Sequence, residues 1–218
     1  MSIFSRKSRS TTVANAAPVG GSAASTAVLD FDPATVAAEN VSGDYVVDPT
    51  HTRIGFSTRH AMVTTVRGAF TEFEGAAHLD VANPANSSAS LRIKVASVDT
   101  GQQQRDEHLR TGDFFDAETY PEILFSSTSV EQLDADVYAV TGDLTIKDVT
   151  RPVTVEFTVV GSAKDPFGNL RVGFEGAATV NRKDWGLTYN AALETGGVLI
   201  SDRIKLEFDV SAIATPAN

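Results

Sequence analysis

The chain has 218 residues and carries 28 acidic against 18 basic side chains, for a formal net charge of −10. This charge argues against nucleic acid as a partner, because phosphate groups would be repelled. Cysteine is absent from the sequence, which excludes disulfides and thiolate metal sites. No apolar run approaches the ~20 residues that a spanning helix requires, so we expect no transmembrane segment.

The first 42 residues are rich in Ser, Ala, Thr and Gly and poor in large apolar side chains. Such a segment cannot bury enough surface to order itself, so residues 1–42 predict a disordered leader. The leader lacks the apolar stretch of a secretory signal, which favours a cytoplasmic location. We expect the folded domain at 43–212 and a short C-terminal tail at 213–218.

Within the expected domain, apolar and polar residues alternate in run after run, with turn residues between the runs. In one such run Leu91, Ile93 and Val95 share one face, while Arg92 and Lys94 share the other. The alternation predicts strands, in chain order, at 45–48, 53–58, 70–80, 88–95, 122–133, 137–146, 152–162, 170–181 and 203–212. One buried and one solvated face is typical of antiparallel sheets, so we expect an all-β barrel or sandwich.

The segment at 98–115 interrupts these strands and predicts a short polar helix. Thr100 and Gln103 have the spacing of a capping box, and Gly112 stands where a left-handed residue commonly ends a helix. Asp106 and Arg110 are spaced for a favourable i,i+4 pair. A helix so well bounded in an all-β chain is expected to cover part of the sheet.

Apolar residues around this helix indicate what it covers. Leu109 and the Phe114-Phe115 pair form an apolar underside, which fits most simply over one end of a barrel. A second covering segment at 181–187 contains Trp185, the only tryptophan. We therefore expect a barrel with a short covering helix.

Several positions on the inward faces of the strands are small, and they bear on whether the barrel is hollow. These positions are Ala77, Gly142, Gly161, Gly176 and Ala178. Small inward residues either leave volume for a ligand or relieve crowding at strand bends. The pattern leaves both interpretations open, and the covering helix favours the cavity because a filled barrel needs no lid.

Ordered motifs along the chain resemble the YceI-like family. The centre of the resemblance is Arg105-Asp106-Glu107-His108-Leu109. The other motifs, in the family's order, lie at 45–56, 66–70, 97–100, 113–116, 120–123, 125–127, 142–146, 149–153 and 182–187. The sequence departs from the family at Thr52, where Ser is frequent, and at Lys147-Asp148, where Gly is frequent in the turn.

The resemblance implies an eight-stranded antiparallel, lipocalin-like β-barrel that binds a polyisoprenoid chain in its interior. Members are mostly bacterial and many are periplasmic, so a periplasmic or secreted location is the alternative to the cytoplasmic one. The resemblance implies no cofactor other than the bound isoprenoid lipid. The sequence leaves a homodimer open.

Aromatic and apolar residues are our candidates for the ligand-binding wall. Each buried CH₂ group contributes about 0.8 kcal/mol, so a few enclosed isoprene units suffice for tight binding. The candidates are Phe56, His60, Met62, Phe73, Phe115, Phe125, Leu144, Phe157, Phe174 and Trp185. Ordinary core packing is the competing interpretation for each of them.

Polar residues on the helix suggest an active site at first sight. Arg105, Asp106 and His108 are turned roughly 100° apart per residue, so they cannot all face one substrate. We interpret them as fixing the lid, with contact to a ligand headgroup as the alternative. Arg182 and Asp184 are expected to form an ion pair that holds the second cover.

The four histidines lack the spacing of a metal site, although a site assembled in space stays open. The favoured function is non-enzymatic: the chain binds, sequesters or transports a polyisoprenoid, such as a prenyl lipid or a quinone tail. One alternative is a hydrolase or isomerase of such a lipid, with His60 or His108 as base. Another is a stress-linked interaction protein.

Overall fold

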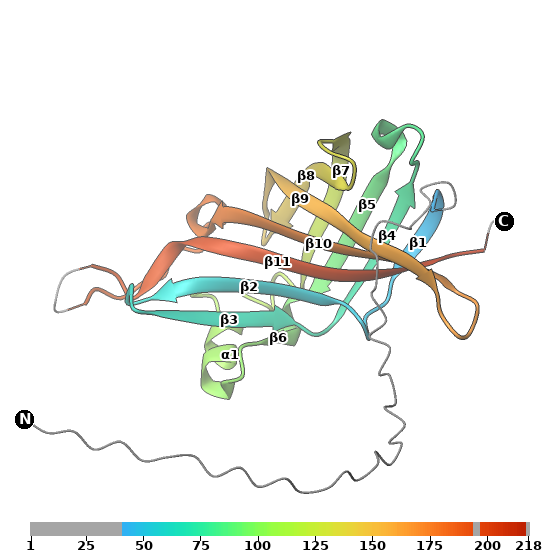
Figure 1. Ribbon diagram of the computed structural model, residues 1–218. Helices are drawn as coiled ribbons and strands as arrows, with labels where there is room; N and C mark the ends of the chain where they lie inside the picture. The colour runs from blue at the N-terminus through green and yellow to red at the C-terminus, as the bar shows by residue number, and fades with distance from the viewer. Residues whose placement is uncertain (1–40, 194–196, 217–218) are drawn as a thin grey trace, which may run out of the picture. The chain divides into compact units, whose positions relative to one another are not determined.

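The computed structural model describes residues 41–193 and 197–216 (Figure 1). The predicted leader at 1–42 lies almost entirely outside these residues. The strands are β1 (Gly43–Val47), β2 (Arg53–His60), β3 (Thr64–Phe70), β4 (Phe73–Leu79), β5 (Ser88–Lys94), β6 (Val98–Asp99), β7 (Glu122–Gln132), β8 (Val137–Ile146), β9 (Val149–Lys164), β10 (Leu170–Asn181) and β11 (Ile200–Ala214). The helical elements are α1 (Gln103–Arg110) and the 3-10 turns η3 (Pro84–Asn86), η4 (Val95–Ser97) and η5 (Arg182–Trp185).

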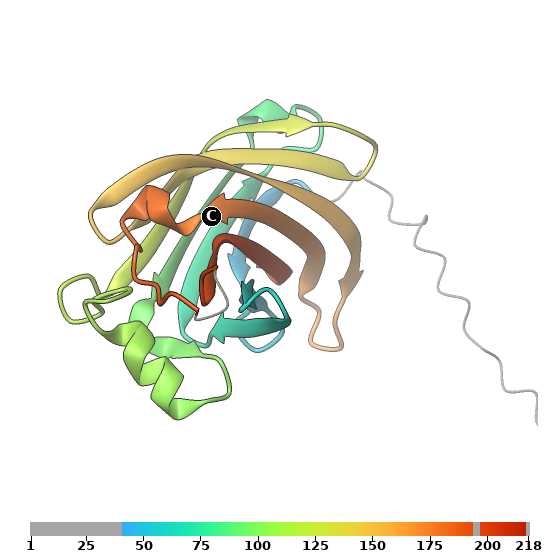
Figure 2. The same ribbon diagram turned by 90° about the vertical axis from the view of Figure 1, so that its left-hand side faces the viewer.

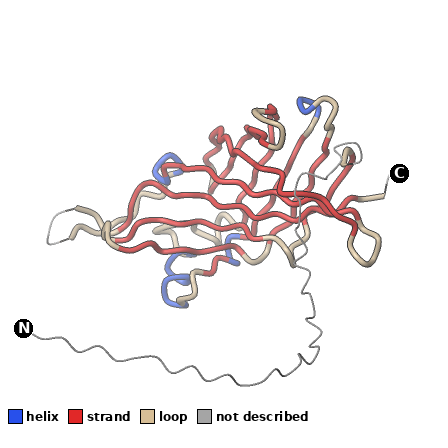
Figure 3. The backbone as a smooth tube through the Cα atoms, in the orientation of Figure 1, coloured by secondary structure: helices blue, strands red, loops and turns tan. Residues whose placement is uncertain are grey.

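Eight of the strands form a closed antiparallel ring in the order β1-β4-β5-β7-β8-β9-β10-β11, and pairing of β1 with β11 closes it. Figure 3 shows how strongly strands dominate the described chain. The structure thus confirms the predicted all-β class and the eight-stranded barrel. The alternation of the sequence explains this choice, because each strand has one apolar face to bury.

The long strand β11 pairs with two strands that follow one another along it. Its C-terminal end pairs with β1, and its earlier residues pair with β2. From β2 the sheet continues outward through β3 to β6. The barrel therefore closes through β1 only, and β2, β3 and β6 form an extension beside it (Figure 1).

The strand β3 was not predicted from the alternation, and the predicted strand at 70–80 begins later, at Phe73. The turn between β2 and β3 places Ala61 and Met62 at positive φ, 49° and 59°. Neither residue type signals such a turn, since glycine, asparagine or aspartate usually supplies this conformation. The strand β11 also runs to Ala214, two residues into the predicted tail.

The helix α1 exists, but its predicted caps were wrong. Gln102 is the N-cap, and its side chain accepts a hydrogen bond from the Arg105 N–H. Gly112 is not left-handed, and the C-cap Thr111 has extended backbone instead. Asp106 and Arg110 do not pair with each other, because each bonds to the chain that precedes the helix.

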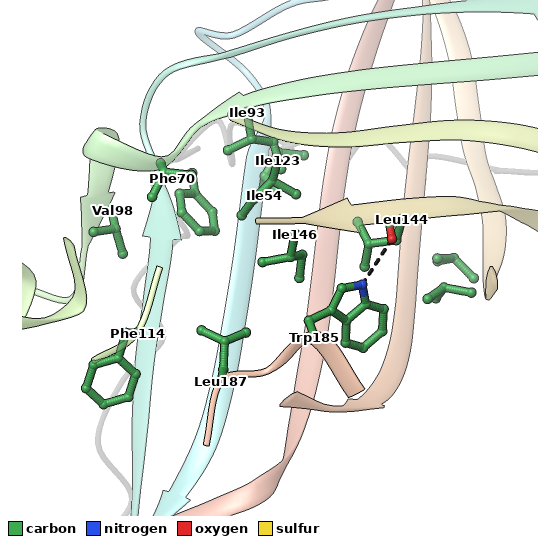
Figure 4. Packing of buried hydrophobic residues seen from close by; sticks show 13 residues of the cluster. Ile54, Phe70, Ile93, Val98, Phe114, Ile123, Leu144, Ile146, Trp185 and Leu187 are labelled. Atoms are coloured by element: carbon green, nitrogen blue, oxygen red, sulfur yellow. Dashed lines mark hydrogen bonds between the residues drawn. The ribbon is translucent and has the colours of Figure 1, made fainter. Parts of the chain in front are cut away.

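The main core lies beside α1 and η5 (Figure 4). Val98 is fully buried, and Phe114, Trp185 and Leu187 are buried against it and its neighbours. Leu109 and Phe115 pack on the same cluster, so the apolar underside of the helix region is covered as expected. The Trp185 indole N–H donates a hydrogen bond of 3.0 Å to the Leu144 carbonyl, which ties η5 to β8.

Two of the small inward positions do not leave volume. A methyl group on Gly176 would collide with the Phe157 ring, which lies directly opposite on β9. A methyl group on Gly142 would collide with the Phe125 ring and with the Ser126 carbonyl. These glycines therefore accept aromatic rings from neighbouring strands.

Candidate functional site

A cavity of about 610 Å³ lies inside the ring of eight strands. Every strand of the ring contributes to its wall: Val47 from β1, Ala77 from β4, Ala89 from β5, Phe125 from β7, Val140 from β8, Phe157 from β9, Phe174 from β10 and Val210 from β11. Alanines at 77 and 89 face each other across the β4–β5 pair. The wall is overwhelmingly apolar, so the interior favours a hydrocarbon ligand.

The cavity ends on the main core. Ile54, Leu144 and Val153 belong both to the cavity wall and to the buried cluster. Trp185 and Ile146 belong to the same buried cluster but do not line the cavity. We call this core, with α1 and η5, the closed end of the barrel.

The opposite limit of the cavity reaches the surface. The exposed residues Ala135, Asp136 and Val160 line it there, together with Asp80 and Ser87 from the β4–β5 connection. The β7–β8 turn therefore forms part of a rim, and β9 continues the rim where its pairing with β10 shifts register. We call this rim and the cavity behind it the open end.

Four predicted wall residues line the cavity: Phe125, Leu144, Phe157 and Phe174. Phe56, Phe73 and Phe115 pack against the main core instead, and Trp185 is buried within it. His60 and Met62 lie at the end of the β2–β3 hairpin, where Met62 is 65% exposed. The structure does not place these six residues in the cavity.

Sequence reasoning did not select other wall residues, such as Ala89 and Val130. Tyr138, Val140 and Val210 also line the cavity, and each lies at an alternating apolar position of a predicted strand. The signal shows which face of a strand is buried. It does not show which half of the strand meets a cavity and which half meets packed core.

The polar residues of α1 fasten it to the chain around β6. Asp106 is buried and accepts hydrogen bonds from the Thr100 N–H and hydroxyl. Arg105 donates to the Thr100 hydroxyl and carbonyl, and Arg110 donates to the Val98 carbonyl. None of these residues lines the cavity among the residues described. Figure 2 shows α1 outside the ring of strands and to one side of it, and its bonds attach it to the chain around β6.

His108 lies on the same side of the molecule. Its ring is 2.8 Å from the Asp113 carboxylate and stacks edge-on against Phe114 and Tyr189. Neither His108 nor His60 lines the cavity within the described chain. Residues 41–193 and 197–216 also contain no group of three or more metal-ligating His, Asp or Glu side chains.

Arg182 is the buried cation of the second cover, and its predicted pairing with Asp184 was wrong. The guanidinium donates to the carbonyls of Ser201, Leu187 and Tyr189 and to the Asp202 carboxylate. Asp184 is exposed, and only its carbonyl takes part, as an acceptor from Arg151. Arg182 thus fastens the segment after η5 to β11, while the lysine beside it, Lys183, shares Asp202.

A largely buried ionic cluster lies on the outer side of the barrel wall near the open end. The Arg171 guanidinium on β10 bonds to Asp48, which follows β1, and to Asp165 in the β9–β10 turn. Bonding to Arg171 holds the pKa of Asp48 well below its usual range, and bonds led by the Asn169 side chain lower the pKa of Asp165 to about 2. The cluster ties the strand pair β9–β10 to the junction between β1 and β2.

The turn between β8 and β9 contains Lys147-Asp148, one of the two departures from the family pattern. Lys147 has a φ of 58°, the left-handed conformation that glycine adopts most easily. The hairpin therefore keeps its geometry with a lysine in the turn. The Thr52 hydroxyl, at the other departure, accepts a hydrogen bond from the Ser211 N–H and so joins the chain to β11.

Fold and cavity together define a closed antiparallel β-barrel with an apolar interior that is packed at one end. The profile of the YceI-like domain matches residues 45–212. The chain belongs to the YceI-like family. No helix in the described parts of the chain has the length and apolar character to cross a membrane.

Relatives and solved structures agree with this membership. Protein YceI of Escherichia coli is 38% identical over 153 residues, which are 69% of this chain and 80% of that protein. BcnA of Burkholderia cenocepacia superposes with a TM-score of 0.67 at 28% identity, covering 78% of this chain and 99% of BcnA. A polyisoprenoid binding domain from Saccharophagus degradans has the same fold, with a TM-score of 0.61 at 19% identity, over 78% of this chain and 98% of that domain.

Proposed function

We propose that this protein binds a polyisoprenoid lipid in the barrel cavity and sequesters or carries it, without catalysing a reaction. The observation that carries the proposal is the apolar cavity of about 610 Å³, walled by all eight strands of the ring. This volume lies within the range of about 300–1,000 Å³ typical of small-molecule sites. The solved neighbour named as a polyisoprenoid binding domain supports the choice of ligand class.

The energetics favour a branched hydrocarbon chain. Burying one isoprene unit contributes roughly 3–4 kcal/mol before the entropic cost of association. Aromatic walls such as Phe157 and Phe174 provide broad apolar contact without a polar group that must be paired. The affinity then depends on the length of the isoprenoid chain, and the orientation of the bound lipid depends on the residues at the rim.

The absence of histidine from the described wall favours binding over catalysis. The proposed enzymatic alternative used His60 or His108 as a base, yet neither lines the cavity as the structure describes it. A general base must come within hydrogen-bonding reach of its substrate. A lipid enclosed in this cavity lies away from both rings.

The test is lipid extraction from natively purified protein, followed by mass spectrometry. We expect a prenyl lipid in the wild type and at least tenfold less in Ala89→Phe, because the ring fills the space opposite Ala77. Ala96→Phe is the matched control, since Ala96 is exposed in η4 and does not contribute to the wall. Wild-type protein that yields no prenyl lipid and takes up none added to it would refute the proposal.

A further inference from the structure

The charges around the cavity discriminate between classes of lipid headgroup. Among the described residues that line the cavity, none is Lys, Arg or His. The charged residues that do line it are all acidic: Asp80, Asp136 and Glu175. From this distribution we infer that the site selects isoprenoids with an uncharged headgroup, such as an alcohol or a quinone, against phosphorylated ones. This inference rests on the function proposed above.

The carboxylates stand where a headgroup would emerge. Asp136 is exposed in the β7–β8 turn, and its backbone carbonyl accepts a hydrogen bond from Val159 on β9. Asp80 directly follows β4, in the hairpin connection that neighbours the β7–β8 turn along the rim. Hydrogen bonds from the Asn86 side chain and the Asn83 N–H lower the pKa of Asp80 and keep it ionised.

Two of the basic groups beside the cavity wall are already paired. Arg171 binds both Asp48 and Asp165, whose side chains are buried on the outer side of the barrel wall. His78, two residues before Asp80, is half-exposed and bonded to Asp44. A phosphate at the rim would therefore meet the like charge of Asp80 and Asp136 and lose part of its hydration, and none of the described lining residues offers a cation to replace the lost water.

Neutral hydroxyl groups serve an uncharged headgroup better. Tyr138 occupies an inward position on β8, opposite Phe157. Ser162 lies opposite the buried Val172 on β10, so it also faces inward. Such hydroxyls can donate to a quinone carbonyl or share a proton with an alcohol. These hydroxyl groups thus offer hydrogen bonds but no positive charge.

The experiment compares two ligands that share one hydrocarbon chain. Delipidated full-length protein is titrated by calorimetry with farnesol and with farnesyl diphosphate at low ionic strength. We expect the wild type to bind farnesol at least tenfold more tightly. Asp136→Lys should raise the affinity for the diphosphate relative to farnesol at least tenfold, because it replaces a rim carboxylate with a cation.

The matched control is Asp148→Lys, which makes the same change of charge in the exposed turn at the other end of β8. It should leave the ratio of the two affinities at the wild-type value. Wild-type protein that binds the diphosphate as tightly as farnesol would overturn the inference and leave the proposed function intact. Failure to bind either ligand would overturn the proposed function itself.

Discussion

Side chains fill the barrel at its closed end, whereas at its open end they line a cavity. The closed end has an aromatic and aliphatic core with Val98 fully buried, and it is covered by α1 and η5. The open end has a rim of turns and carboxylates, and the short 3-10 turn η3 lies in its β4–β5 connection. The contrast indicates a division between the two ends, in which one supplies stability and the other provides the cavity in which we propose that the lipid binds.

Truncating an aromatic residue at each end gives the largest expected difference. Trp185→Ala should lower the free energy of unfolding by about 3–5 kcal/mol, since it empties a packed site and leaves the Leu144 carbonyl unpaired. Phe174→Ala should cost about 1–2 kcal/mol, because that ring already borders the cavity and has fewer partners to lose. Urea denaturation measures both values. Equal losses at the two positions would contradict the division.

The buried guanidinium provides the next largest effect. Arg182→Met should cost about 2–4 kcal/mol, because three carbonyls and the Asp202 carboxylate lose their donor. The matched change at the open end, Arg171→Met, should cost less, since the Arg171 side chain is 26% exposed against 5% for Arg182 and is already partly hydrated. The midpoints of urea denaturation rank the two variants. A larger loss for Arg171→Met would show that the ionic cluster, rather than the core, supports the barrel.

The sequence predicts these two ends unequally. Alternation predicts the strands well, because a half-buried strand must present one apolar face. It predicts the closed end partly, since Leu109, Phe114 and Trp185 are large and apolar whatever they contact. Alternation does not distinguish Phe56, which packs against the core, from Phe125, which lines the cavity, because both lie on the apolar face of a strand. Their surroundings depend on where β11 pairs with β1 and where it pairs with β2. The caps of α1 and the partner of Arg182 depend on similar long-range contacts.

Substitution of Gly176 on β10 tests whether the Phe157 ring is fixed in the cavity wall or can move away from it. Gly176→Ala should cost about 1–3 kcal/mol, because the added methyl group collides with the Phe157 ring and pushes it into the cavity. Gly173→Ala on the same strand is the control, since its methyl group would meet only ordinary contacts at 3.6 and 3.8 Å. Thermal unfolding measures the stability of the two variants, and lipid uptake measures how much ligand each one binds. Full uptake by a destabilised Gly176→Ala would mean that the ring settles elsewhere than in the cavity.

Acid should weaken the open end through the cluster of Asp48, Asp165 and Arg171. The pKa values of both carboxyl groups are lowered in the folded chain, to about 2 for Asp165, from an ordinary value of 3.8. A lowered pKa stabilises the fold above the unfolded value, and this contribution disappears as the pH falls from about 4 toward 2.

We therefore expect the urea midpoint to fall more between pH 5 and pH 3 in the wild type than in Arg171→Met, whose carboxylates have lost their shared cation. Asp202 gives a background loss common to both, because bonding to Lys183 lowers its pKa at the closed end in either protein. An equal fall in the two proteins would assign the acid sensitivity to the closed end. A smaller fall in Arg171→Met would assign it to this cluster, because protonation of Asp48 and Asp165 removes the charge that Arg171 pairs with between the β9–β10 turn and the end of β1.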